Sequence, residues 1–490
     1  MVVNSHILTK SLGWKLAERF GVQGVQFVLQ IILARLLNPE HYGMLSMMIV
    51  FTTLANVFIQ AGFGTSLIQN KDVTEDDYSS VFWVTISIAV IIYALLFFSA
   101  PFIATFYNMP EIVNPFRVLT LMLLPGSLNS IQFSKISREM DFKKSFISNI
   151  YAVTISGIIG IILAYLNAGF WALVVQTVLS IVVVCVVMWF TVKWRPKLIC
   201  DIKRVKVLFT FGWKLLISSL LDTLFLELQS LIIGKKYDSG TLGYYNRGKQ
   251  FPQFIVSSVN SALQSVMLPA MAKEQDEKAK VKELMRKSLT LSAFIIFPIM
   301  AGLASVATPL VSLLLTDKWL PCVPYLRIYC FVFAFYPIFT CNLQAINAMG
   351  RSDIFLKLEI IKKAFSLAAI IIAVIFFDSP IAIAISGAIT ILPSFIINAF
   401  PNKKLIGYSY FEQIIDILPS LIVALVMSGI VLVIEKFAFG HILTLVIQVF
   451  IGALTYVGLS AIFKLKPYTM LIKLIKAWRA KRKVSRFLSL

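Results

Sequence analysis

Eight basic side chains lie inside long apolar stretches of the sequence, where a charge needs a partner. They are Lys15, Arg19, Arg35, Arg117, Lys214, Arg247, Lys249 and Arg327. The comparable acidic residues are Glu18, Asp222 and Glu227. A charge at a bilayer centre costs on the order of 2.5–3.5 kcal/mol on insertion scales, so such residues normally face a bundle interior or a wet cavity. The surplus positive charge predicts an anionic ligand, for which phosphate or pyrophosphate is the natural candidate.

Two of the apolar stretches carry a polar stripe when they are drawn as helices of 100° per residue. Residues 11–37 place one set within about 80° of arc, namely Lys15, Arg19, Gln23, Gln26 and Gln30. Residues 208–234 do the same with Lys214, Ser218, Asp222 and Gln229. The alternative is that these groups only join helices, with Lys15, Glu18 and Arg19 pairing locally and the glutamines bonding across interfaces.

The basic residues sort by depth into two groups. The inner group consists of Lys15, Arg19 and Lys214, and the outer group of Arg35, Arg117, Arg247, Lys249 and Arg327. An anionic headgroup could therefore pass between two basic sites. For Arg35, Arg247 and Lys249 the alternative is that they snorkel to the membrane interface. Asp222 is the candidate for ion coupling, or else it neutralises Lys214 or Arg19.

The elements that must position these residues are transmembrane helices. The sequence is 58% hydrophobic with a mean hydropathy of +0.84, and a helical span needs about 20 apolar residues. Fourteen spans are predicted, which makes an all-α integral membrane protein: 11–37, 42–69, 79–107, 111–134, 146–166, 170–192, 208–234, 241–268, 286–316, 321–348, 355–377, 381–400, 411–435 and 441–463. Five prolines inside them are expected to bend the helices: Pro125, Pro298, Pro309, Pro393 and Pro419.

Charge placement predicts how the helices are oriented. Of the 45 Lys and Arg residues, 33 fall in the N-terminus, the even-to-odd connections and the C-terminal tail, four in the odd-to-even connections and eight inside helices. Short loops that are rich in Lys and Arg stay in the cytoplasm. Both termini are therefore expected on the cytoplasmic side of a bacterial inner (plasma) membrane. The basic tail, residues 464–490, is expected to contact anionic membrane lipids. Dispersed charge without a binding motif argues against nucleic acid.

Catalytic and metal-binding patterns are not found in the sequence. The five cysteines have no metal or disulfide spacing, and the three histidines form no ligand set. We find no P-loop or nucleophile motif, and the outer loops are too short for a catalytic domain. The sequence therefore predicts a protein that is not an enzyme and has no cofactor and no metal.

An internal repeat divides the chain. Gly13-Trp14-Lys15 recurs as Gly212-Trp213-Lys214, and Gly43 falls opposite Gly243. Six helices in each copy is an even number, so the two bundles are expected to be related by a pseudo-two-fold axis along the membrane normal. The predicted parts are a first bundle, a basic cytoplasmic linker, a second bundle, two extra helices and the tail: 1–192, 193–207, 208–400, 401–463 and 464–490.

Three longer stretches carry a family resemblance. Residues 32–43, 62–72 and above all 242–253 (LGYYNRGKQFPQ) resemble the polysaccharide transport branch of the multidrug/oligosaccharidyl-lipid/polysaccharide exporter superfamily, and in particular its Wzx-type members. The resemblance implies two six-helix bundles that open alternately around a central cavity, with two extra C-terminal helices. It also implies a flippase for isoprenoid-pyrophosphate-linked oligosaccharides, with glycan polymerase and glycosyltransferases as candidate partners. Gln229-Ser230 departs from the Asp-Asn expected there, which shifts attention to Asp222.

The roles implied for the charged residues follow from that substrate. Lys15, Arg19 and Lys214 would receive the pyrophosphate inside, and Arg117 and Arg327, with Arg247, would hold it outside. The sugar hydroxyls would bond Gln23, Gln26, Gln30, Ser218 and Gln229. The alternatives are a cation-coupled multidrug exporter, which would want an acidic or aromatic cavity, and a membrane scaffold that recruits glycan-assembly enzymes without transport.

Overall fold

The computed structural model describes residues 13–14, 17–60, 62–69, 72–435, 437, 440–473 and 476. For Arg19, Phe20, Thr65, Gln69, Phe211 and Lys214 it describes the backbone only. All regular elements in these ranges are helices, as the apolar composition predicts. Contacts divide the chain into two compact units, Met1–Gly243 and Tyr244–Leu490.

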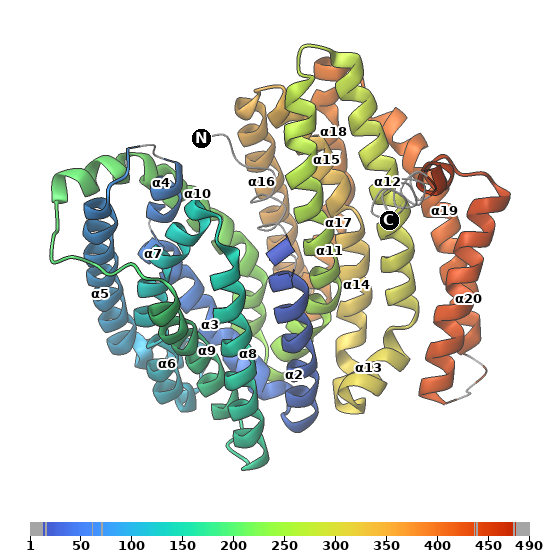
Figure 1. The fold of residues 1–490 in the computed structure, drawn as a ribbon. Helices are drawn as coiled ribbons and strands as arrows, with labels where there is room; N and C mark the ends of the chain where they lie inside the picture. Colours follow the sequence, from blue (N-terminus) through green and yellow to red (C-terminus); the bar gives the residue numbers. More distant parts are fainter. Residues whose placement is uncertain are drawn as a thin grey trace, which may run out of the picture. The chain divides into compact units, whose positions relative to one another are not determined.

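The first unit contains the helices up to α10 and the start of α11 (Figure 1). Their bounds are η1 (Glu18–Val22), α2 (Gln23–Leu36), α3 (Pro39–Gln60), α4 (Phe63–Gln69), α5 (Glu75–Tyr107), η2 (Pro110–Ile112), α6 (Val113–Thr120), α7 (Leu123–Glu139), α8 (Phe142–Tyr165), α9 (Trp171–Thr191), α10 (Ile202–Lys236) and α11 (Ser239–Lys273). Helix α8 packs along α9 and against α2, and α10 packs on α3, α4 and α5. The contacts thus group α10 with the first unit, whereas the repeat places it at the start of the second copy.

The second unit contains the remaining helices. Their bounds are α12 (Lys278–Ser305), α13 (Ala307–Leu315), η3 (Asp317–Cys322), α14 (Val323–Ala334), α15 (Tyr336–Ala348), α16 (Ser352–Phe376), α17 (Pro380–Ile389), α18 (Ile391–Ile406), α19 (Tyr410–Glu435) and α20 (His441–Ile462). Helix α12 packs along α19, which packs on α20 (Figure 1). Lys282 Nζ lies 3.0 Å from Glu412 Oε1 and Arg286 Nε 2.6 Å from Asp416 Oδ2, so ion pairs attach the extra C-terminal helices to this unit.

Eleven described helical segments are long and apolar enough to cross a membrane. Three predicted spans are missing from that set for separate reasons. In the first, α2 has 14 residues, and the fourth is split into α6 and α7. The eleventh, α16, is long and apolar, but Glu359, Lys362 and Lys363 put three charges into even its most apolar span-length stretch. The fold class is confirmed as all-helical and membrane-spanning, and the count of fourteen stays a prediction.

Prolines mark most of the breaks within spans. Pro125, Pro309 and Pro393 each follow shortly after a junction between consecutive helices, namely α6–α7, α12–α13 and α17–α18. Proline lacks the N–H that bonds four residues back and its ring crowds the preceding turn, so the helix breaks on its N-terminal side. Pro298 and Pro419, which are also expected to bend their spans, lie inside the unbroken helices α12 and α19.

The linker between the two copies is held onto α5. Arg204 Nη1 lies 2.9 Å from Asp77 Oδ2, and Lys197 Nζ 2.8 Å from Asp76 Oδ1. The Trp83 indole N–H donates to the Lys197 carbonyl at 2.8 Å. The hydrogen bond and charge of Asp76 raise the pKa of Lys197, so this pair persists through neutral pH. The linker is therefore part of the first unit's packing.

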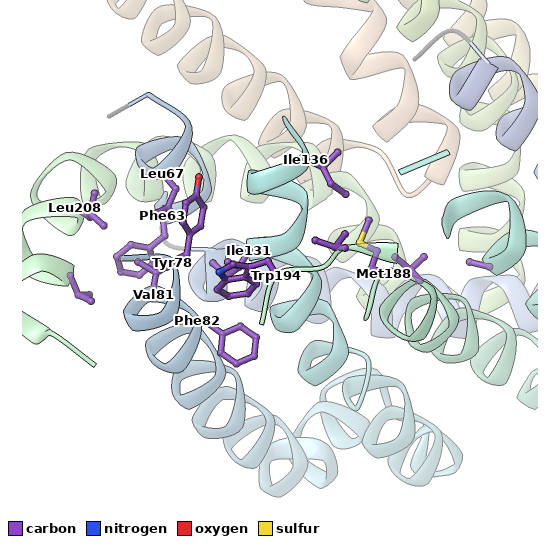
Figure 2. Close-up of a cluster of buried hydrophobic side chains, with 14 residues drawn as sticks. Phe63, Leu67, Tyr78, Val81, Phe82, Ile131, Ile136, Met188, Trp194 and Leu208 are labelled. Atoms are coloured by element: carbon purple, nitrogen blue, oxygen red, sulfur yellow. The ribbon is translucent and has the colours of Figure 1, made fainter. Parts of the chain in front are cut away.

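A hydrophobic cluster lies beneath this linker. Figure 2 shows Phe63 and Leu67 of α4, Phe82 of α5 and Ile131 of α7 around the Trp194 ring. Each of these side chains is at most 8% exposed. The cluster fixes α4 against α5 and α7, and so fixes the walls of a cavity described below.

The two glycines matched by the repeat meet in the first unit. A Cβ on Gly43 would overlap the carbonyl oxygen of Ser239, and a Cβ on Gly243 would overlap that of Pro39. The first turns of α3 and α11, Pro39–Gly43 and Ser239–Gly243, therefore cross backbone to backbone. Only glycine fits such a close approach, and the reciprocal contact is what a duplicated element would make with its copy.

Candidate substrate-binding site

The predicted stripe at the start of the chain is interrupted by a π-helical turn. Residues Glu18–Val22 form η1, and the regular α2 begins only at Gln23. A π turn holds more residues than an α turn, so it changes the angular phase between residues before and after it. The assumption of one continuous α-helix was therefore wrong. Lys15 and the Arg19 side chain lie outside the described residues.

The glutamines of α2 remain on a regular helix. Gln26 is exposed, whereas Gln23 and Gln30 are half-buried. Upstream, Glu18 Oε1 accepts hydrogen bonds from Ser145 Oγ at 2.6 Å and Asn149 Nδ2 at 2.7 Å. Local pairing of Glu18 with Lys15 is the alternative given above, and the structure shows that two residues of α8 bind this carboxylate. The π turn is thereby fixed against α8.

Helix α10 preserves its predicted stripe because it is unbroken from Ile202 to Lys236. Ser218 and Asp222 are exposed and Gln229 is half-buried. At 100° per residue these positions share about 80° of arc with position 214. The side chain of Lys214 lies outside the described residues, so its contribution stays a prediction, as does the coupling role of Asp222.

Arg117 and Arg327 make matching contacts in the two units. Arg117 Nε donates to the Phe97 carbonyl at 3.3 Å, and Arg327 Nε donates to the Ala304 carbonyl at 3.2 Å. Phe97 lies four residues before Pro101, which has no N–H to give it. Ala304 lies in the last turn of α12, where carbonyls lack helical partners. Both arginines thus replace a missing backbone donor, which the sequence did not reveal.

The Arg117 contact predicts an energetic coupling to Pro101. Arg117→Ala is expected to cost about 1 kcal/mol of stability, because the Phe97 carbonyl loses its donor in a medium without water. In a Pro101→Ala background the cost should shrink, since the restored N–H serves the same carbonyl. Thermal unfolding of the four purified proteins measures the coupling. Equal losses in both backgrounds would contradict the structural role.

Arg247 is buried in an aromatic cluster of the second unit. It is 5% exposed, its Nη1 donates to Gln250 Oε1 at 2.8 Å, and its guanidinium carbon lies 5.2 Å from the Trp319 ring centre. Nearby, the hydroxyls of Tyr245 and Tyr329 are 2.5 Å apart. Snorkelling to an interface is therefore not what Arg247 does here. Tyr245 and Arg247 of the 242–253 motif therefore help to build this cluster.

The sequence reasoning missed a group of small polar residues in the first unit. Ser130, Ser134 and Ser137 share one face of α7, and Asn56 and Gln60 share one face of α3. All five line a cavity of about 510 Å³. The i, i+4 and i+7 spacing of the serines is visible in the sequence. Uncharged polar residues are common in membrane helices, however, so this spacing alone does not mark a site.

Sequence comparison finds relatives along most of the chain. A protein family described as "Polysaccharide biosynthesis protein" matches residues 32–324. The teichuronic acid biosynthesis protein TuaB of Bacillus subtilis (strain 168) is 27% identical over 83% of this chain and 86% of its own length. The lipopolysaccharide biosynthesis protein WzxC of Escherichia coli (strain K12) is 25% identical over 86% and 87%.

Two solved structures have a similar fold. The lipid II flippase MurJ in an inward closed conformation superposes with a TM-score of 0.77, covering 94% of this chain and all of its own, at 16% identity. An inward-facing MATE-family multidrug resistance transporter of the MOP superfamily gives a TM-score of 0.61 over 79% of this chain and 98% of its own, at 14% identity. These likenesses establish the fold.

Proposed function

Because the chain belongs to the polysaccharide biosynthesis protein family, we propose that it is a flippase for isoprenoid-pyrophosphate-linked oligosaccharide repeat units. It moves their headgroups across the bacterial inner membrane for lipopolysaccharide, capsule or exopolysaccharide biosynthesis. The observation that carries this proposal is the match along more than four-fifths of the chain to proteins of teichuronic acid and lipopolysaccharide biosynthesis. The fold, which a lipid II flippase shares, supports it. The protein is a transporter and not an enzyme.

The proposed architecture has fourteen spans. The remaining three spans are supplied by α2, the pair α6–α7 and α16, which length, hydropathy and charge content do not identify by themselves. Two six-helix bundles related along the membrane normal, with α19 and α20 added, open alternately, and both termini are cytoplasmic. The lipid tail stays in the bilayer, so the protein needs no cavity that would hold the tail.

The inner cations Lys15, Arg19 and Lys214 receive the pyrophosphate, while Gln23, Gln26, Gln30, Ser218 and Gln229 bond the sugars. A ligand shifts a conformational equilibrium only through different affinities for the two states. The outer arginines must therefore bind the headgroup more tightly in the outward-open state. In both Arg117 and Arg327 the Nε atom already donates to a backbone carbonyl. Arg327 Nη2 also donates to Thr308 Oγ1 at 3.1 Å. We therefore assign headgroup contact to the Nη groups of Arg117 and to Nη1 of Arg327. Arg247 would contact it only after leaving its aromatic cluster.

A deletion strain tests this function. Lipid-linked oligosaccharide should accumulate with its headgroup facing the cytoplasm, and mass spectrometry should identify the repeat unit. Purified protein in proteoliposomes should then flip that lipid. If the protein were a multidrug exporter, the deletion strain would lose drug resistance, and its pool of lipid-linked oligosaccharide would stay unchanged. A scaffold without transport activity would restore glycan assembly in cells and give no flipping in proteoliposomes.

A further inference from the structure

The cavity in the first unit lies between helix ends that share one predicted side of the membrane. Its walls are the C-terminal half of α3, the short α4, the C-terminal half of α7 and the middle of α10, and Thr85 of α5 also lines it. The connections near these ends are predicted to be cytoplasmic. Gln60, Ile68 and Ser219 are exposed, so the cavity is open on one side. Its volume of about 510 Å³ is typical of small-molecule sites, which span about 300–1,000 Å³.

The described lining carries no charge and combines polar with apolar side chains. Its aliphatic side chains are Val57, Ile68, Ile131, Leu215 and Leu216. Eight of its side chains are hydroxyls or carboxamides: Thr53, Asn56, Gln60, Thr85, Ser130, Ser134, Ser137 and Ser219. The rings of Phe63 and Phe133 are also in the wall. A phosphate site needs Arg, Lys or backbone N–H groups, and none of the described lining residues is basic. This chemistry instead suits a neutral polyol that has apolar ring faces.

The hydrogen bonds set the direction in which these groups can bind. Ser130 Oγ donates to the Ser127 carbonyl at 2.8 Å and Ser134 Oγ to the Ser130 carbonyl at 2.9 Å. Their protons are thus committed, and their oxygens can accept from a ligand. The carboxamides of Asn56 and Gln60 bond no protein group among the described residues, and each can both donate and accept. Sugar hydroxyls also donate and accept, so they match both walls.

Glycines hold the cavity open. Gly62 has a φ of +71°, and a Cβ there would lie 2.5 Å from the Gly212 carbonyl oxygen. This backbone crossing fixes the turn before α4 against α10. A Cβ on Gly64 would lie 3.2 Å from Ser134 Oγ, inside the lining. Larger residues at these positions would close the space between α4 and α7.

We propose that this cavity is a binding subsite for neutral sugar residues, separate from the basic residues assigned to the pyrophosphate. Asn56 and Gln60 on one wall and the α7 serines on the other bond sugar hydroxyls, while Phe63 and Phe133 pack on ring faces. The claim that the bound sugar belongs to a lipid-linked glycan rests on the proposed function. The binding of neutral sugars does not.

Protection from alkylation tests the subsite directly. Ser137→Cys is introduced into full-length protein that lacks Cys185 and Cys200, which leaves the buried Cys322, Cys330 and Cys341. Glucose, galactose or N-acetylglucosamine should slow its alkylation about threefold at twice the Kd. Inorganic pyrophosphate should not. Leu198→Cys, at a position that is 92% exposed, is the matched control and should not be protected. Failure of all three sugars to protect Ser137→Cys, or protection by pyrophosphate, overturns the subsite.

Variants connect binding with transport. Asn56→Leu with Gln60→Leu should abolish the protection and slow flipping, whereas Phe58→Leu, which lies between them on α3 and outside the lining, should change neither. The protection measurement on Ser137→Cys stands even if the double variant does not fold. Sugar protection without any flipping by the intact protein would overturn the proposed function and leave this site. Flipping of the lipid by the intact protein, without sugar protection of Ser137→Cys, would support the proposed function and overturn this subsite.

Discussion

Replacing Lys15, Arg19 and Lys214 together with alanine is expected to lower headgroup flipping by about a hundredfold or more. Each charge-assisted hydrogen bond contributes about 1.5–3 kcal/mol, and about 1.4 kcal/mol corresponds to a factor of ten. The pyrophosphate has no other inner partner among the residues assigned to it. Flipping of the native lipid in proteoliposomes, with surface glycan measured in cells, gives the result.

A matched variant separates the site from total charge. Lys403, Lys404 and Lys473 are exposed and lie outside the polar stripes, so their replacement with alanine removes the same charge. That variant should flip normally. The substitution of Lys15 and Lys214 by Arg should retain most activity, because the positive charge remains. Normal flipping by the triple Lys15, Arg19 and Lys214 variant would remove these residues from the mechanism.

Gly43→Ala and Gly243→Ala are each expected to prevent stable folding. The added methyl would overlap a backbone carbonyl oxygen, of Ser239 in one case and of Pro39 in the other. Overpacking costs about 1–3 kcal/mol where side chains can move aside, and more where the obstacle is backbone. The yield of monodisperse protein and its unfolding temperature measure the effect.

The chain offers a control for helix propensity. Gly24 lies in α2, and among the described residues no atom outside the backbone of its own helix lies within 4 Å of the position that an added methyl group would occupy. Gly24→Ala should leave stability unchanged or raise it by about 0.5–1 kcal/mol, because alanine favours the helix. If Gly43→Ala behaved like Gly24→Ala, the crossing of α3 and α11 would not be present in the folded protein.

Much of the fold was predictable because membrane helices follow local composition. The hydropathy of residues 79–107 predicts α5, which ends at Tyr107 as expected. The repeat pairs Gly43 with Gly243, and in the structure the two helix turns that carry them cross. Boundaries outside the apolar core were less accurate: α10 begins at Ile202 instead of 208, because Asp201 caps it through the N–H groups of Lys203 and Arg204.

The candidate site was predictable only in part. The sequence identified Arg117, Arg247 and Arg327 as unusual, since a cation in an apolar helix is visible from its neighbours. It could not identify their partners. The Phe97 carbonyl, the Trp319 ring and the Ala304 carbonyl lie 20, 72 and 23 residues away in sequence. Which atom a long side chain reaches depends on which helices pack together.

The amino-acid sequence alone determined that this protein is a helical membrane protein. It also predicts that the chain is duplicated and that its helices carry surplus positive charge. Hydropathy, repeats and charge are properties of short segments, so no knowledge of packing is needed to see them. Only the tertiary structure decided which arginines support broken helices and that small polar residues of α3 and α7 line one cavity. Those roles arise where segments distant in sequence meet, and packing decides where that happens.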